Sequence, residues 1–275
     1  MTEEQPLVSV VTPAYNAEAF LAETIQSVLD QTYRNFEIIV VDDASTDRTA
    51  EIAEGFGPPV RVLRNERNLE RSASRNRAVA EARGDLIALL DADDLWLPEK
   101  LEKQVAVMNR DPHAALVYGK AEAFVMEEGE RRIIWGYGSE LPKHRADLAL
   151  IEGNPIASFT ALFRRQAFRA VGGFCEEPWI QCSGEDYDLW LRMGRCYRFR
   201  FIPEVLGLYR RHKQQTTYRQ ASSSAQAAVV ALRHMLRQEP PDEPAERSYE
   251  RACAQIRDAI EQEHRALRAE AERYH

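Results

Sequence analysis

Three carboxylates within four residues, Asp91, Asp93 and Asp94, directly follow a short apolar run in this 275-residue chain. Such a run, preceded by Gly84, is typical of a buried strand in a parallel sheet. Ligands of open α/β sheets bind beyond the carboxyl ends of the strands, so we expect these carboxylates in a cleft. Residues two apart on an extended chain point to the same side, which would bring Asp91 and Asp93 together.

Carboxylates crowded in this way repel one another unless a cation joins them. Hard oxygen ligands suit Mg²⁺ or Mn²⁺, and these ions usually share such a site with substrate phosphates. The simpler alternative is that the acidic cluster caps a helix expected after Pro98. Three acids exceed what a cap needs, so the pattern favours a metal site.

Strands and helices are expected to alternate in the first part of the chain. Apolar or β-branched runs predict strands at 7–12, 36–41, 60–63 and 86–90. Apolar residues at helical spacing predict helices at 17–31, 72–83 and 99–110, and Ser45 or Thr46 could cap a further helix. This order predicts a doubly wound α/β fold with a mostly parallel sheet. Because no glycine-rich phosphate loop is present, phosphates must be held by a metal and side chains.

Composition excludes several classes of protein. The net charge of −8 argues against a nucleic-acid groove, and the four cysteines have no CxxC spacing that would indicate zinc. The N-terminal residues lack the pattern of a signal peptide, and no apolar run approaches the ~20 residues of a membrane span. We therefore expect a cytoplasmic protein without a transmembrane segment, and peripheral attachment to the inner membrane face stays open.

Several long motifs occur in a fixed order along the chain. They are Val-Ser-Val-Val-Thr-Pro-Ala-Tyr-Asn, Val-Val-Asp-Asp-Ala-Ser-Thr-Asp, Gly-Asp-Leu-Ile-Ala-Leu-Leu-Asp-Ala-Asp-Asp and Gly-Glu-Asp-Tyr-Asp-Leu-Trp-Leu. Together with 68–76 they resemble family 2 glycosyltransferases, over residues 7–212. Members of that family are inverting enzymes of the GT-A fold that use nucleotide sugars. The resemblance implies transfer of a monosaccharide from a UDP- or dTDP-linked donor to a saccharide or another hydroxyl acceptor.

The resemblance assigns nucleotide contacts to the ends of the first two strands and to one helix. Pro13, Ala14 and Tyr15 would hold the nucleobase, with the Tyr15 ring as a stacking face, although Tyr15 alone could be an ordinary core aromatic. Asp43 would accept a hydrogen bond from a uracil-type ring N–H. Arg75 would lie near the base and the diphosphate.

Three positions near this helix depart from the family pattern. The family usually has Gly where Glu70 stands, and Gly with an apolar residue where Arg77 and Ala78 stand. The extra carboxylate and guanidinium leave the detailed nucleotide contacts open.

The acidic cluster matches the Asp-x-Asp motif of the family. The resemblance places Asp91 on the ribose with Ala92 beside it, and Asp93 on the divalent ion, Mn²⁺ or Mg²⁺, that joins the two phosphates. His212 follows a basic run that resembles the family's Tyr-Arg-x-His segment, and it would be a metal ligand or a diphosphate contact. A lone histidine in a basic run would otherwise be read as a surface residue.

A second acidic pair, Glu185 and Asp186, opens a predicted helix. Carboxylates in a first helical turn are stabilised by the helix dipole, which is one explanation. The other is catalytic, because inverting transfer needs a base that takes the proton of the acceptor hydroxyl. Asp186 matches the family's catalytic aspartate, and Glu185 is its usual neighbour in the site. Trp179, just upstream, could stack on a sugar or could be a surface residue.

The second part of the chain mixes strands and helices, which suits the acceptor side of a cleft. Strands are expected at 115–125, 131–135, 156–163, 197–202 and 205–209, with helices at 145–151 and from 185. We predict a glycosyltransferase domain at 1–220, with a nucleotide-sugar half at 1–112 and an acceptor half at 113–220. A helical appendage at 221–275, peripheral to catalysis, could form a homodimer. Two other functions stay open: a nucleotide-sugar binding protein without transfer activity, and a metal-dependent sugar nucleotidyltransferase.

Overall fold

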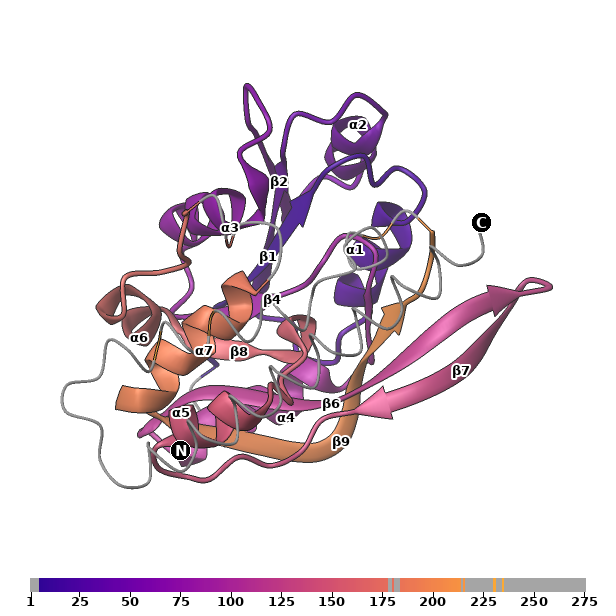
Figure 1. Cartoon of the computed structure of the whole chain (residues 1–275). Coiled ribbons are helices and arrows are strands. Elements are labelled where there is room, and N and C mark those ends of the chain that lie inside the picture. The colour runs from indigo at the N-terminus through magenta and orange to yellow at the C-terminus, as the bar shows by residue number, and fades with distance from the viewer. Residues whose placement is uncertain are drawn as a thin grey trace, which may run out of the picture.

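The computed structural model describes residues 5–177, 180, 184–213, 215, 230 and 234. Within these residues the chain forms one nine-stranded sheet with helices packed on it (Figure 1). The strand order is β3-β2-β1-β4-β8-β6-β9-β5, and β7 pairs with β6 beside this path. No helix in the described part of the chain is long and apolar enough to cross a membrane.

The first half is a parallel sheet with helices in the connections. Its strands are β1 (Val8–Ala14), β2 (Phe36–Asp42), β3 (Val60–Arg64) and β4 (Leu86–Leu89), and its helices are α1 (Leu21–Leu29), α2 (Thr49–Glu54) and α3 (Glu70–Glu81). Alternate residues of β1 belong to different hydrophobic cores, with Val11 in one core and Val8 and Val10 in the other. Because both faces of β1 are covered, all seven residues of the strand are buried.

The second half continues the sheet with strands in both directions. Its elements are β5 (Leu95–Trp96), α4 (Lys100–Arg110), β6 (Ala114–Glu127), β7 (Glu130–Tyr137), α5 (Ala146–Glu152), the 3₁₀ helix η1 (Ser158–Thr160), β8 (Leu162–Arg164), α6 (Arg165–Ala170), α7 (Glu185–Cys196) and β9 (Arg198–Arg210). Strand β8 runs antiparallel between β4 and β6, and β6 runs parallel to β9. The hairpin of β6 and β7 projects from the body of the molecule (Figure 1).

Most predicted elements are present, and the differences lie where strand pairing overrides local pattern. The expected strand at 156–163 is instead η1 followed by β8. The two strands expected on either side of Pro203 are one strand, β9, whose register against β6 shifts near that proline. Pro203 lacks an N–H, and such irregularities let a strand accommodate it. The short strand β5 and helix α6 were not expected.

The predicted C-terminal appendage at 221–275 lies outside the described residues, except for two side chains. Val230 is buried in the larger core, and His234 Nε2 lies 3.6 Å from Asp147 Oδ2 of α5. The domain boundary at residue 220 and the homodimer therefore stay predictions.

Gly84 lies between α3, which ends at Glu81, and the start of β4 at Leu86. It lies where the turn into β4 passes close to β1. Its N–H donates to Ser9 Oγ at 2.9 Å, and a Cβ added to it would lie 2.8 Å from that oxygen and 2.9 Å from the Ser9 nitrogen. The absence of a side chain allows β1 and the turn to approach.

We predict that Gly84→Ala lowers the free energy of unfolding by about 1–3 kcal/mol, because the added methyl group overpacks this contact. Gly153→Ala is the matched control, since nothing lies within 4 Å of a Cβ there. The control should stay within about 0.5 kcal/mol of the parent. Urea denaturation measures both. Equal effects at the two glycines would show that the close approach at Gly84 is unimportant for stability.

Candidate active site

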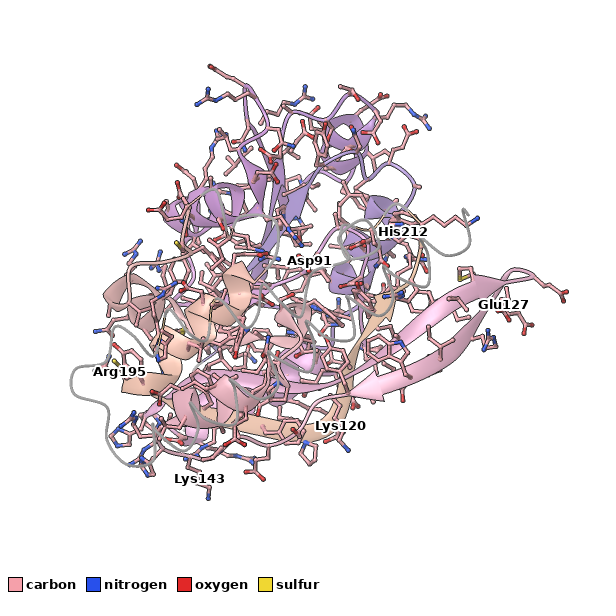
Figure 2. All side chains as sticks on the ribbon, in the orientation of Figure 1. Asp91, Lys120, Glu127, Lys143, Arg195 and His212 are labelled. Carbon is pink, nitrogen blue, oxygen red and sulfur yellow. The ribbon has the colours of Figure 1, made fainter. Side chains whose placement is uncertain are left out.

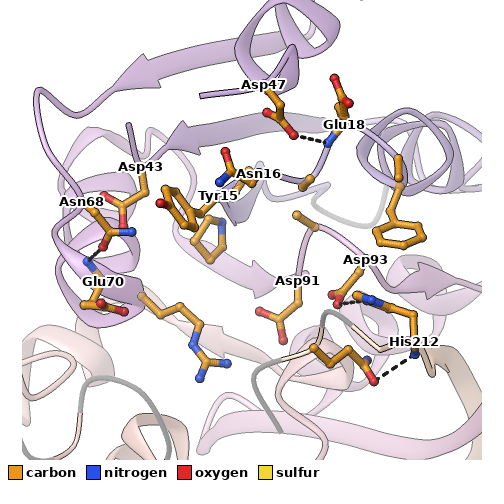
Figure 3. A pocket seen from close by; sticks show the side chains of 18 of the residues that line it. Tyr15, Asn16, Glu18, Asp43, Asp47, Asn68, Glu70, Asp91, Asp93 and His212 are labelled. Atoms are coloured by element: carbon orange, nitrogen blue, oxygen red, sulfur yellow. Dashed lines mark hydrogen bonds and ion pairs between the residues drawn. The ribbon is translucent and has the colours of Figure 1, made fainter. Parts of the chain in front are cut away.

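A cavity of about 540 Å³ opens at the carboxyl ends of β1, β2 and β4 (Figure 3). Its volume is in the range of small-molecule sites. The residues that line it are Pro13, Ala14, Tyr15, Asn16, Ala17, Glu18, Ala19, Phe20, Asp43, Asp47, Asn68, Glu70, Arg71, Asp91, Ala92, Asp93, Tyr209, His212 and Gln215. They come from both halves of the chain.

Eight of the residues nominated from the sequence line this cavity together. They are Pro13, Ala14, Tyr15, Asp43, Asp91, Ala92, Asp93 and His212. Arg75 and Glu185 are buried and do not line it, and Asp186 is half-buried at the start of α7. Trp179 lies outside the described residues.

One end of the cavity combines an aromatic face with fixed polar groups. Tyr15 is 52% exposed, and Asp43, Asn68 and Glu70 lie around it (Figure 3). Asp43 Oδ1 accepts hydrogen bonds from Asn65 Nδ2 at 2.6 Å and from the Leu69 nitrogen at 2.9 Å. These bonds fix the carboxylate and leave it further capacity as an acceptor.

Glu70 adopts a left-handed backbone conformation with φ of 67° at the start of α3. Its N–H donates to Asn68 Oδ1 at 2.9 Å, which holds the turn. Such a conformation is unfavourable for a residue with a side chain, and it accounts for glycine being usual at this position in the family.

Asp91 and Asp93 both line the cavity, as expected, although the segment that carries them is not extended and Asp94 points elsewhere. Strand β4 ends at Leu89, and the Asp94 N–H bonds back to the Asp91 carbonyl at 3.2 Å, so the segment turns. Asp94 is fully buried and accepts a hydrogen bond from the Arg210 N–H at 3.0 Å. Burial, together with the charges of Asp93 and Asp91, raises the pKa of Asp94 well above its usual range. Asp94 therefore holds the turn after β4 against the end of β9. It does not cap a helix, because α4 begins only at Lys100.

Asp93 and His212 form a pair at the cavity wall. His212 Nε2 lies 2.9 Å from Asp93 Oδ2, and the imidazole packs on the Phe20 ring with centroids 4.3 Å apart (Figure 3). A carboxylate oxygen suits Mn²⁺ or Mg²⁺, and a neutral imidazole nitrogen is a common metal ligand. No cluster of three or more such side chains occurs among the described residues, so phosphates or water would complete the coordination. The pair therefore fits a cation that is shared with a phosphate ligand.

Arg75 links the two acidic motifs from inside the protein. Its side chain is 1% exposed, Nη2 lies 2.6 Å from Asp91 Oδ1, and Nη1 lies 2.8 Å from Glu185 Oε1. Asp91 Oδ2 also accepts a hydrogen bond from Ser158 Oγ at 3.2 Å. Although burial opposes ionisation, Arg75 holds the pKa of Asp91 below its usual value. The guanidinium thus fixes the start of α7 against the end of β4.

Asp186 follows Glu185 in the first turn of α7, which begins after Gly184 with φ of 93°. Its Oδ1 accepts the Tyr187 N–H at 2.8 Å. Burial, with the neighbouring charge of Glu185, raises the pKa of Asp186 to about 6, despite the opposing charge of Arg75. A carboxylate with this pKa can take a proton near neutral pH.

Arg71 is a cavity residue that the sequence analysis did not nominate. It stands one helical turn before Arg75 on α3, and its Nε lies 3.6 Å from Glu185 Oε1. Residues four apart share one helix face, so Arg71 and Arg75 point the same way from α3. Arg71 lines the cavity, whereas Arg75 lies buried behind it. Tyr209, just before the basic run of β9, was missed because only strand pairing brings it to the cavity.

We predict that Arg75→Met lowers the free energy of unfolding by about 3–5 kcal/mol, because the buried Glu185 and the partly exposed Asp91 lose the cation that they share. Arg64→Met is the control: Arg64 Nη2 lies 2.8 Å from Glu54 Oε1, and both side chains are more than half exposed. Removing a surface pair of this kind costs only about 0–1 kcal/mol. Urea denaturation of both variants measures the difference, and similar losses would contradict a special role for Arg75.

Sequence comparison identifies the relatives of this chain. The sequence model of glycosyl transferase family 2 matches residues 9–172. EpsE of Bacillus subtilis, named as a glycosyltransferase, is 37% identical over 193 residues, which cover 68% of this chain and 66% of that protein. MJ1057 of Methanocaldococcus jannaschii, named as an uncharacterized glycosyltransferase, is 34% identical over 213 residues, 75% of this chain and 71% of that protein. The chain spans 66%, 44% and 62% of the first three curated relatives it matches.

Two solved structures share the fold. The 1–349 fragment of S. aureus TarS, in complex with UDP-GlcNAc, aligns with a TM-score of 0.69 at 19% identity, over 92% of this chain and 71% of that chain. The mannosyltransferase PcManGT from Pyrobaculum calidifontis, in complex with GDP-Man and Mn²⁺, aligns with a TM-score of 0.62 at 20% identity, over 98% and 81%. These matches confirm the predicted GT-A fold, and with the family match they lead to one conclusion: the chain belongs to glycosyl transferase family 2.

Proposed function

We propose that this chain transfers a monosaccharide from a nucleoside diphosphate sugar to a hydroxyl acceptor, with inversion at the anomeric carbon. The observation that carries the proposal is the contact of Arg75 with both Asp91 and Glu185. This contact joins Asp91, at the wall of the cavity, to the first turn of α7. The same turn carries Asp186, whose pKa is raised.

The donor's base would stack on Tyr15 and donate a ring N–H to Asp43. Uracil and thymine carry such a group, which agrees with the expected UDP- or dTDP-linked donor, and guanine carries one as well. Among the structural neighbours, TarS is in complex with UDP-GlcNAc and PcManGT with GDP-Man. The ribose would lie near Asp91 and Ala92, beyond the end of β4.

The diphosphate would lie between the Asp93–His212 pair and the guanidinium of Arg71. Asp93 and His212 would hold Mg²⁺ or Mn²⁺, and a bound ion would stabilise the negative charge that develops on the leaving diphosphate. PcManGT is in complex with Mn²⁺. Arg71 adds positive charge on the same side, held in place by Glu185.

Asp186 would act as the general base. The acceptor oxygen forms a bond to the anomeric carbon while its proton passes to the Asp186 carboxylate. The bond from that carbon to the phosphate oxygen breaks, and its electron pair leaves with the nucleoside diphosphate. Attack from the face opposite the leaving group inverts the configuration.

We predict that UDP with Mn²⁺ stabilises the protein by about 2.7 kcal/mol at a hundredfold excess over Kd. Asp93→Ala should abolish the part of this gain that depends on the metal. Asp85→Ala, which removes an exposed carboxylate paired with Arg165, is the control and should keep the full gain. Thermal melts with UDP and Mn²⁺, separately and together, measure the effect. The donor assignment fails if neither UDP nor the metal raises the melting temperature.

We predict that Asp186→Asn lowers sugar transfer about 10²–10⁴-fold, since an amide cannot accept the proton. Transfer by the parent should rise with pH through about 6, the pKa of Asp186, because the base works only when ionised. The raised pKa means that the folded protein favours the protonated form, so stability from this group falls as pH rises from 3.8 through about 6. Asp186→Asn should therefore not lower the melting temperature at pH 7.5.

Asp188→Asn is the matched control, because Asp188 lies in the same first turn but pairs with Arg192 at 2.6 Å. If the acids of this turn only favour the helix dipole, worth about 0.3–1 kcal/mol, both variants would lose stability and keep activity. The assay uses a panel of nucleotide sugars and detects the released products. Free nucleoside diphosphate indicates glycosyl transfer, whereas pyrophosphate would indicate a nucleotidyltransferase and contradict the proposal.

A further inference from the structure

Four aromatic rings form a continuous row from the core to the projecting hairpin. Phe159 of η1 stacks on Tyr209 of β9, with centroids 6.2 Å apart and planes at 18°. Tyr209 contacts Trp135 of β7 at 6.1 Å, and Trp135 contacts Tyr137 at 5.2 Å. The row therefore crosses from one strand to another that is far away in sequence.

Small residues on the intervening strand allow these rings to meet. Ala123 of β6 pairs with Trp135 on one side and with Tyr209 on the other. Gly207 of β9 makes room for Phe159, because a Cβ there would lie 2.8 Å from the Phe159 ring. Side chains directly opposite one another on a sheet share a face. The row is therefore a surface built by strand register.

The exposure of the rings to solvent increases from Phe159 through Tyr209 to Trp135. Phe159 is buried and Tyr209 is half-buried at the cavity wall, whereas Trp135 is 43% exposed. Figure 2 shows the direction of the hairpin, with Glu127 at its far end and Asp91 near the centre of the molecule. A tryptophan exposed beside a cavity adds little to the core and is free to contact a ligand.

The same row lies close to the expected reaction centre. Tyr209 lines the cavity with Asp91 and Asp93. Arg75 joins Asp91 to Glu185, the residue before Asp186, so Tyr209 opens on the same site as the start of α7. Burial raises the pKa of Tyr137, and the charges of Asp94 and Asp186 raise it further.

The face that carries the rings has no charge at the positions paired with them, since Ala121, Ala123 and Gly207 are small and apolar. Arg210 of β9 directly follows Tyr209, so its side chain points to the opposite face of the strand, where it forms an ion pair with Glu23. Flat aromatic faces with a phenol at the edge suit a ligand with apolar C–H faces and polar rims, such as a pyranose ring.

We propose that Trp135, Tyr137 and Tyr209 form an acceptor platform that binds the ring of a neutral saccharide beside Asp186. This inference rests on the proposed function, because it names the acceptor class of the same site.

The test measures saccharide binding directly, by saturation-transfer NMR on the full chain. The probes are cellobiose, chitobiose, mannobiose and lactose, with glycerol 3-phosphate as a hydroxyl compound without a ring. We expect at least one disaccharide to receive saturation at its ring C–H protons. Trp135→Ala should weaken that binding about tenfold, which corresponds to about 1.4 kcal/mol. Trp135→Phe should bind within about threefold of the parent because a ring is kept.

Met126→Ala is the matched control, because Met126 is an exposed apolar residue of the same hairpin outside the ring row. It should bind like the parent. The proposal is overturned if no disaccharide binds, if Trp135→Ala binds like the parent, or if glycerol 3-phosphate binds best. UDP and GDP binding with Mn²⁺ is measured in parallel. Saccharide binding that depends on Trp135, without nucleotide binding, would refute the proposed function and leave the platform standing.

Discussion

The guanidinium of Arg75 carries its charge where water does not reach, and two carboxylates from distant parts of the chain surround it. Removing a charge from water is costly unless partners replace the lost hydration. Asp91 and Glu185 supply that replacement, and Glu185 is itself buried beside the guanidinium. The end of β4 and the start of α7 are therefore held in one arrangement, and the positions of Asp93 and Asp186 follow from it.

This constraint explains why the two halves of the sheet form one site. The parallel half delivers the ends of β1, β2 and β4 to a single edge. The mixed half reaches that edge through β9, whose Arg210 N–H bonds Asp94 and whose continuation brings His212 to Asp93. Each half supplies one member of the Asp93–His212 pair and of the Arg75–Glu185 pair.

The sequence predicted the parts of the structure that depend on local pattern. Apolar periodicity located β1 to β4 and most helices, and ordered motifs led to eight side chains of the cavity wall. It could not show that Asp94 turns away from Asp91 and Asp93 into the protein interior, because that depends on where β4 ends. It also missed the ring row, since Trp135 and Tyr209 are 74 positions apart and meet only because Ala123 pairs with both. Pairings set by strand register leave no trace in the local pattern of residues.

Strand β7 has an open edge, which bears on whether molecules with exposed aromatic rings associate in solution. Among the described residues it pairs only with β6, so its outer edge presents unpaired backbone groups beside exposed rings. Open edges of this kind invite strand-to-strand association between molecules. Here the edge begins with Glu130, Arg131 and Arg132, and the pairing with β6 is irregular after Ala123. Charge and irregularity both oppose addition of another strand, so the hairpin can display aromatic rings without becoming a template for aggregation.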